Sequence, residues 1–171
     1  MSPDLPLGVA TGVRVHRRVD VYTDAHEVWR QSRDRFPRSL RRFAGIAVDM
    51  IYDHFLARDW ERYHGEPLAS FTATAYDEIG QHSTLFTPRL ERLFPLMSSG
   101  DWLASYQEFE NTQFALERMS GRSPRTAPLA ETAHEMAPIY SGLADDFEQF
   151  FPELQLAAQA ARDDVLVLLE Q

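Results

Sequence analysis

The chain has 171 residues, 44% of them hydrophobic and 25% charged, a composition typical of one soluble globular domain with a buried core. It contains neither cysteine nor lysine, which excludes disulfides, thiolate metal sites, cysteine nucleophiles, lysine Schiff bases and a Walker lysine. The formal net charge of −9 arises entirely within residues 101–171, because residues 1–100 balance 13 arginines against 13 acids. Such a balance argues against general nucleic-acid binding, which favours a basic domain.

No segment of the sequence predicts export or membrane insertion. The N-terminus lacks the basic and apolar regions of a signal peptide. The aliphatic run at 165–169 is too short to span a bilayer. We therefore expect a cytoplasmic protein.

Apolar residues recur with a helical period throughout, and no alternating pattern is long enough for a sheet, so the sequence predicts a single all-α domain over residues 1–171. The first helix is expected from about Leu7 to Val21. Asp24 resembles an N-cap, with Glu27 three residues later, for a second helix over 26–36.

A long central helix is expected next, from Pro37 in its first turn to about Tyr63, with Gly65 and Pro67 ending it. Its apolar residues would form a broad buried stripe, which consists of Phe43, Ile46, Ala47, Met50, Ile51 and Phe55.

The second half of the chain predicts further helices, separated mainly by proline and glycine. Ser99 can cap a continuous helix over 101–119, which Gly121 would end, and the clearest loop covers 123–128. The other expected boundaries are a helix over 67–82, a short helix bracketed by Pro88 and Pro95, a break near Pro138 and a restart at Pro152. One face of the helix over 101–119 would carry Trp102, Tyr106, Phe109, Gln113 and Leu116.

Two segments concentrate residues suited to metal-assisted attack on a phosphate ester. In the first, His16 and Asp20 are four residues apart, and in the second Asp49 and Asp53 have the same spacing, so each pair shares a helix face. Imidazole and carboxylate ligands favour Mn²⁺, Mg²⁺ or Fe²⁺, and a bound metal can activate water and neutralise phosphate charge. Arg17 or Arg18 could hold a phosphate by a bidentate pair.

Simpler interpretations of these residues remain open. An i,i+4 His/Asp pair is commonly a surface interaction, and Asp24 can be only a helix cap. Asp49 and Asp53 can form salt bridges with Arg42 or Arg58, and His54 can be a core histidine. Four histidines lack a convincing partner in the sequence, and the last three of them are interpreted as surface residues: His26, His64, His82 and His134.

Arginines dominate residues 30–42, where six of them stand against Asp34 alone. They are Arg30, Arg33, Arg35, Arg38, Arg41 and Arg42. This excess of positive charge is either a solvated helix face or a surface that attracts an acidic partner.

Both segments resemble a known family. Residues 12–26, GVRVHRRVDVYTDAH, are similar to the "G-I-x-L-H-R-x-I-D-x-F-T-D-x-H" motif of bacterial acyl carrier protein phosphodiesterases. Residues 42–57, RFAGIAVDMIYDHFLA, resemble that family's "R-x-x-G-I-x-x-D-x-x-Y-D-H-F-L-A" motif. Asp101-Trp-Leu103 with Tyr106, and the segment 146–153, are also similar, so the resemblance covers nearly the whole chain.

The resemblance implies an all-helical, HD-domain-like fold and a Mn²⁺- or Mg²⁺-dependent hydrolase that removes 4′-phosphopantetheine from holo acyl carrier protein. It makes His16, Asp20, Asp24, Asp49, Asp53 and His54 candidate metal ligands, with Asp20, Asp53 and His54 also candidates for acid/base catalysis. The candidate substrate contacts are Arg17, Arg18, Arg38, Arg41 and Arg42, the last three as a docking surface for the acidic carrier protein.

The chain departs from the family pattern at its N-terminus. Family members usually begin further upstream, with an "N-F-L-A-H" segment and a "G-D-F" motif that supply a His and an Asp to the metal site. This sequence begins just before the His16 motif and contains neither. We expect a site without those two ligands to bind metal weakly. Two alternatives follow, a form that binds a carrier protein without cleaving it and a hydrolase of another phosphodiester such as coenzyme A or a nucleotide.

Overall fold

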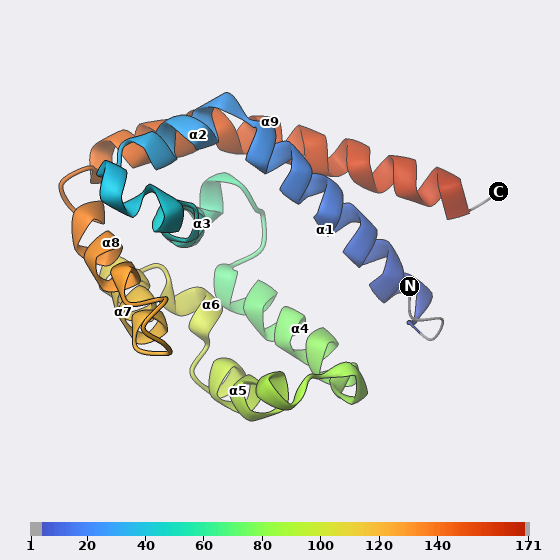
Figure 1. Ribbon diagram of the computed structural model, residues 1–171. Coiled ribbons are helices and arrows are strands. Elements are labelled where there is room, and N and C mark those ends of the chain that lie inside the picture. Colours follow the sequence, from blue (N-terminus) through green and yellow to red (C-terminus); the bar gives the residue numbers. More distant parts are fainter. Residues whose placement is uncertain (1–4, 170–171) are drawn as a thin grey trace. The chain divides into compact units, whose positions relative to one another are not determined.

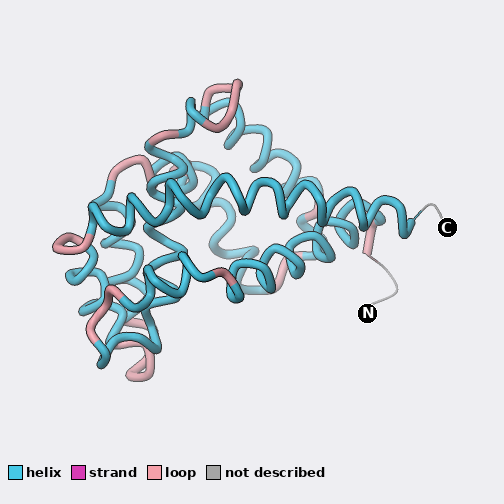
Figure 2. The backbone as a smooth tube through the Cα atoms, turned by 90° about the horizontal axis from the view of Figure 1, so that it is seen from above, coloured by secondary structure: helices cyan, strands magenta, loops and turns pink. Residues whose placement is uncertain are grey.

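The structure is a computed structural model that describes the backbone of residues 5–169 and the side chains of residues 5–167. All regular elements in this range are helices, which confirms the all-α prediction (Figure 2). The chain divides into two compact units, unit 1 with residues up to Arg41 and from Ile139 onward, and unit 2 with Arg42–Pro138. None of the helices in the described part combines the length and apolar character that crossing a membrane requires.

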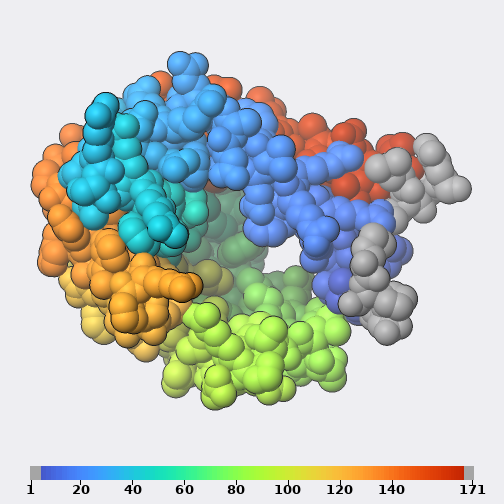
Figure 3. All heavy atoms as spheres, viewed as in Figure 1, coloured from blue at the N-terminus to red at the C-terminus, as the bar shows by residue number. Residues whose placement is uncertain are grey.

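Unit 1 is built on two long helices that run alongside each other, α1 and α9, with α2 also packed against α9 (Figure 1). In the space-filling view, the blue atoms of α1 lie directly against the red atoms of α9 (Figure 3). The elements of unit 1 are α1 (Leu7–Ala25), α2 (Glu27–Asp34), the 3-10 turn η1 (Arg38–Leu40) and α9 (Tyr140–Leu169).

The boundary between α1 and α2 differs from the prediction. Helix α1 continues past Val21 to Ala25, so Asp24 lies within it and does not cap α2. The break falls at His26, whose backbone is extended. The imidazole of His26 packs against Phe150 with ring centroids 4.9 Å apart, and its Nε2 lies 3.3 Å from a carboxylate oxygen of Glu153. These contacts to α9 hold His26 at the bend.

Helix α9 also corrects the prediction, because it passes through Pro152 without a break. Proline removes one backbone hydrogen bond and usually bends or ends a helix. Here Phe150 before the proline, and Ala161 and Val165 after it, are all buried. Burial of one continuous face on both sides of Pro152 offsets the lost hydrogen bond.

A buried acidic residue links α2 to α9. Asp146 has no exposed surface, and its carboxylate accepts two hydrogen bonds from Arg35, at 2.7 Å from Nε and 2.8 Å from the terminal nitrogen. Ser32 Oγ and Gln31 Nε2 donate to the same carboxylate at 2.6 and 2.9 Å. Gly142 makes room for this cluster, since a Cβ there would lie 2.7 Å from the Arg35 guanidinium carbon. Asp146 therefore has a full set of donors.

Unit 2 contains the remaining helices. They are α3 (Arg41–Arg58), η2 (Trp60–Arg62), α4 (Leu68–Gln81), η3 (Ser83–Leu85), α5 (Pro88–Ser99), α6 (Trp102–Ser105), α7 (Phe109–Ser120) and α8 (Pro128–Met136). The predictions of a helix over 67–82, of an end at Gly121 and of a break near Pro138 are confirmed.

The central helix, α3, is shorter than predicted. Pro37 precedes the separate turn η1, and α3 ends at Arg58 instead of near Tyr63. After Arg58 the chain forms the turn η2, where the Trp60 indole donates to the Glu66 carbonyl at 2.7 Å. The buried stripe is also shifted, because Ile46 is 42% exposed while Ala44, Val48 and His54 are buried.

Two further predicted boundaries in the second half are wrong. Pro95 lies inside α5, where the Ser98 hydroxyl donates to the Phe94 carbonyl at 3.0 Å. The helix predicted over 101–119 is divided into α6 and α7, and Asp101, not Ser99, caps α6. Asp101 has a left-handed backbone, φ 39°, and its carboxylate accepts from the Ala104 N–H at 3.3 Å. The Tyr106 carbonyl therefore lies outside a regular helix.

Candidate active site

Helix α3 carries three of the predicted metal ligands, Asp49, Asp53 and His54, within unit 2. Asp49 and Asp53 are one helical turn apart and share a face, and both are exposed. His54 is buried, with 2% of its surface exposed. The helix thus places two carboxylates at the surface beside an imidazole in the interior.

The division between α6 and α7 creates the hydrogen bond that fixes His54. The Tyr106 carbonyl accepts from His54 Nδ1 at 2.8 Å. A carbonyl can only accept, so Nδ1 carries the hydrogen and Nε2 has the lone pair when the ring is neutral. Burial lowers the pKa of His54 below its ordinary value of 6.5, although the bond to Tyr106 opposes this shift. His54 is a hydrogen-bonded core histidine with the tautomer that metal-binding histidines often adopt.

We expect nitrogen NMR to show His54 neutral, with the proton on Nδ1, at pH 6.5, where an ordinary histidine is half protonated. Because its pKa is lowered on folding, the stability that His54 contributes is present above pH 6.5 and is lost as the pH falls. The NMR signal of His54 is identified by its absence from the spectrum of the variant His54→Gln. Protonation of Nε2 in the neutral ring, or titration above pH 6.5, would contradict the assignment.

Asp53 borders a small cavity of about 110 Å³ whose lining is mostly apolar. The Asp53 side chain keeps access to solvent, but the side chains around this cavity, among them Leu56, Trp60 and Phe71, displace water from one side of its carboxyl group. This loss of hydration, together with the charge of Asp49, raises the pKa of Asp53 from 3.8 to about 6. A carboxyl group with this pKa can exchange a proton near neutral pH.

Asp53→Asn is expected to raise the free energy of unfolding of the metal-free protein above pH 6. Because the pKa of Asp53 is raised on folding, the native state loses stability as the pH rises from 3.8 to about 6 and the carboxyl group ionises. Asparagine does not ionise and avoids this loss. Urea unfolding with a chelator across this range measures the effect, with Asp77→Asn on the exposed face of α4 as the control. If the free energies of unfolding of Asp53→Asn and wild type change in parallel with pH, this prediction is wrong.

The other predicted acidic and histidine residues lie on α1 in unit 1. His16 Nε2 is 3.4 Å from an Asp20 carboxylate oxygen, as their spacing predicts, and the two side chains are 73% and 55% exposed. Asp24 is exposed one turn further along the helix. The structure thus pairs His16 with Asp20 on an open helix surface.

The predicted arginine contacts differ in their surroundings. Arg18 pairs with Asp164 on α9 at 2.7 Å, and Arg41 lies 3.3 Å from Asp34. Arg17, Arg38 and Arg42 are exposed. Other members of the 30–42 cluster have internal partners, namely Asp146 for Arg35, the Trp29 ring for Arg33 and the Ala25 carbonyl for Arg30. The cluster is therefore not one uniform solvated basic face.

Among the described residues, no group of three or more His, Asp or Glu side chains is close enough to form a metal site. The donors are arranged as pairs, His16 with Asp20 in unit 1 and Asp49 with Asp53 in unit 2. The predicted metal site stays a prediction.

Comparison with known proteins identifies the family. The sequence model of the family described as acyl carrier protein phosphodiesterase matches residues 2–154. Proteins named acyl carrier protein phosphodiesterase from Salmonella paratyphi A and Salmonella dublin are each 34% identical over 158 residues, covering 92% of this chain and 81% of the relative. The chain belongs to the acyl carrier protein phosphodiesterase family. No solved structure matches it, so the HD-like architecture stays a prediction.

Within this acyl carrier protein phosphodiesterase family member, sequence reasoning assigned no role to Tyr106. Its carbonyl holds His54, and it also lines the cavity beside Asp53. Burial and the Asp53 charge both raise the pKa of the Tyr106 phenol. Tyr106 lies in the segment with Asp101 that resembles the family. The continuous helix predicted over 101–119 gave no reason to expect the Tyr106 carbonyl to accept a hydrogen bond from a distant side chain.

Proposed function

We propose that this chain hydrolyses the phosphodiester that links 4′-phosphopantetheine to holo acyl carrier protein, releasing the apo protein. The observation that carries the proposal is the raised pKa of Asp53, about 6, which suits proton transfer. Asp49 lies one helical turn before Asp53, and the following residue, His54, is held by a hydrogen bond to the Tyr106 carbonyl. The family name of the relatives supports the substrate.

The reaction forms a bond between a water oxygen and phosphorus and breaks the bond between phosphorus and the carrier-protein oxygen. A proton from the water ends on that leaving oxygen. We assign this proton movement to the Asp53 carboxyl group, which is open to solvent and ionises near neutral pH. His54 is buried, and its Nδ1 bond to Tyr106 fixes the orientation of the ring inside unit 2.

We further propose that the activity depends on Mn²⁺, Mg²⁺ or Fe²⁺. Asp49 is a candidate ligand within unit 2, where Asp53 keeps its proton-transfer role, and His16, Asp20 and Asp24 are candidates within unit 1. The donor chemistry, carboxylates with imidazole, suits these cations. Such an ion, when bound, would supply charge neutralisation at the phosphate and lower the pKa of a bound water. For contacts with the acidic carrier protein we propose the exposed arginines, Arg17, Arg38 and Arg42.

Intact-mass spectrometry of holo acyl carrier protein tests the proposal. Incubation with the folded chain and Mn²⁺ is expected to remove the phosphopantetheine mass, and incubation with a chelator is not. A reaction with Mn²⁺ alone is the control. An unchanged mass in every reaction, with saturable carrier-protein binding, would instead support a binding-only role. Cleavage of coenzyme A, with the holo acyl carrier protein left intact, would support a hydrolase that acts on a different phosphodiester substrate.

A further inference from the structure

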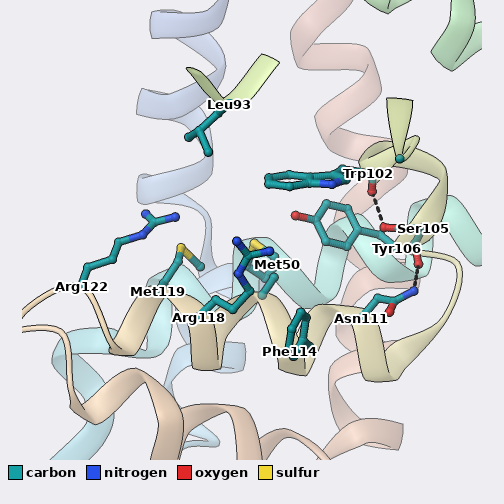
Figure 4. A pocket seen from close by; sticks show the side chains of 12 residues that line it. Met50, Leu93, Trp102, Ser105, Tyr106, Asn111, Phe114, Arg118, Met119 and Arg122 are labelled. Atoms are coloured by element: carbon teal, nitrogen blue, oxygen red, sulfur yellow. Dashed lines mark hydrogen bonds between the residues drawn. The ribbon is translucent and has the colours of Figure 1, made fainter. Parts of the chain in front are cut away.

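Unit 2 contains a second, larger cavity of about 340 Å³ that is partly open to solvent (Figure 4). Its volume falls at the lower end of the roughly 300–1,000 Å³ that small-molecule pockets occupy. Residues of α3, α5, α6 and α7 line it, and the apolar part of the lining consists of Met50, Leu93, Trp102, Phe114, Ala115 and Met119. Figure 4 shows the Trp102 indole lying beside the Tyr106 ring on one wall.

Two arginines are the charged residues of this pocket's lining, Arg118 on α7 and Arg122 just after it. The guanidinium carbon of Arg118 is 5.7 Å from the ring centroids of both Trp102 and Phe114. No ion pair joins either arginine to a carboxylate in the described part of the chain. Their N–H groups are therefore available to oxygen acceptors of a ligand.

Tyr106 connects this pocket to Asp53 and His54. It lines the larger pocket and also the smaller cavity that Asp53 borders. Its carbonyl holds His54 Nδ1, while Figure 4 shows its phenol oxygen directed into the larger pocket. A ligand whose reacting group lies at Asp53 would extend past Tyr106 into the larger pocket.

We propose that the larger pocket binds the pantetheine arm of the carrier protein, an inference that rests on the proposed function. Pantetheine alternates methylene and methyl groups with amides and a hydroxyl, so it needs an apolar surface that also carries hydrogen-bond donors. The aromatic and methionine side chains provide the surface, and Arg118 and Arg122 donate to the amide carbonyls. The arm thus lies in the pocket while its phosphate end is at Asp53.

Calorimetric titration of free pantetheine into the full, metal-free chain tests this site without phosphate, carrier protein or turnover. Wild type is expected to bind saturably. Ala115→Phe fills the pocket from α7 and is expected to weaken binding at least about tenfold. Ala73→Phe adds the same ring at an exposed position of α4 outside the pocket and is expected to bind like wild type.

A second pair of variants keeps the test independent of whether Ala115→Phe folds. Arg122→Gln, in the pocket lining, is expected to weaken pantetheine binding, whereas Arg125→Gln, which is exposed and outside the lining, is not. No binding to wild type, or equal binding to wild type, Ala115→Phe and Arg122→Gln, would overturn the pocket assignment even if the holo protein is cleaved. Pantetheine binding that both pocket variants weaken would support it even if cleavage fails, and the failure would then be that of the proposed function.

Discussion

Asp146→Ala is expected to lower the free energy of unfolding by about 3 kcal/mol, because it leaves the Arg35 charge without its buried partner. The loss lies at the lower end of the range for broken buried ion pairs, since the Arg35 side chain is 32% exposed and can be partly hydrated. Ser32, which is fully buried, also loses the acceptor of its hydroxyl group.

Asp145→Ala provides the matched control for this measurement. Asp145 precedes Asp146 on α9 but is exposed, so its replacement should change stability by no more than about 0.5 kcal/mol. Urea unfolding followed by circular dichroism compares the two variants with wild type. If Asp146→Ala matches Asp145→Ala, the cluster of Arg35, Ser32 and Asp146 does not stabilise unit 1 as the geometry indicates.

Asp53→Asn is expected to reduce turnover of holo acyl carrier protein by about 10²–10⁴-fold, the usual contribution of a general acid or base. Asparagine has nearly the shape of aspartate but cannot exchange a proton at a pKa of about 6. The same variant is expected to be more stable than wild type above pH 6. Loss of activity with a gain in stability distinguishes a functional residue from a structural one.

Initial rates from the mass-spectrometric assay, at saturating Mn²⁺ and carrier protein, measure this effect. Asp77→Asn removes a carboxylate from the surface of α4 in the same unit and should retain the wild-type rate. Turnover by Asp53→Asn within threefold of wild type would remove Asp53 from the proton-transfer step.

Several features of the protein follow from the sequence alone. Helical periodicity predicted the all-α fold, the start of α1 at Leu7, the extent of α4 and the end of α7 before Gly121. The spacing of His16 and Asp20 predicted their pairing on one face. The motifs at 12–26 and 42–57 also indicated the family. Each of these depends on residues close together in the chain, where spacing sets geometry.

Other features depend on contacts between distant residues. The break at His26 is held by Phe150 and Glu153, and the helix through Pro152 continues because residues on both sides of it are buried. These contacts offset local preferences for a cap or a break, which are worth only about 1–3 kcal/mol.

The candidate site was the part least accessible to sequence reasoning. Asp53 acquires its raised pKa from surrounding side chains, and His54 is fixed by the Tyr106 carbonyl, 52 residues away. Neither effect is local, because hydration and hydrogen bonding depend on what the fold brings near each group. The sequence alone determined which residues can carry the chemistry and which helices hold them. Which of them are buried, which are paired and which cavity borders Asp53 depends on contacts that form only when distant parts of the chain fold together.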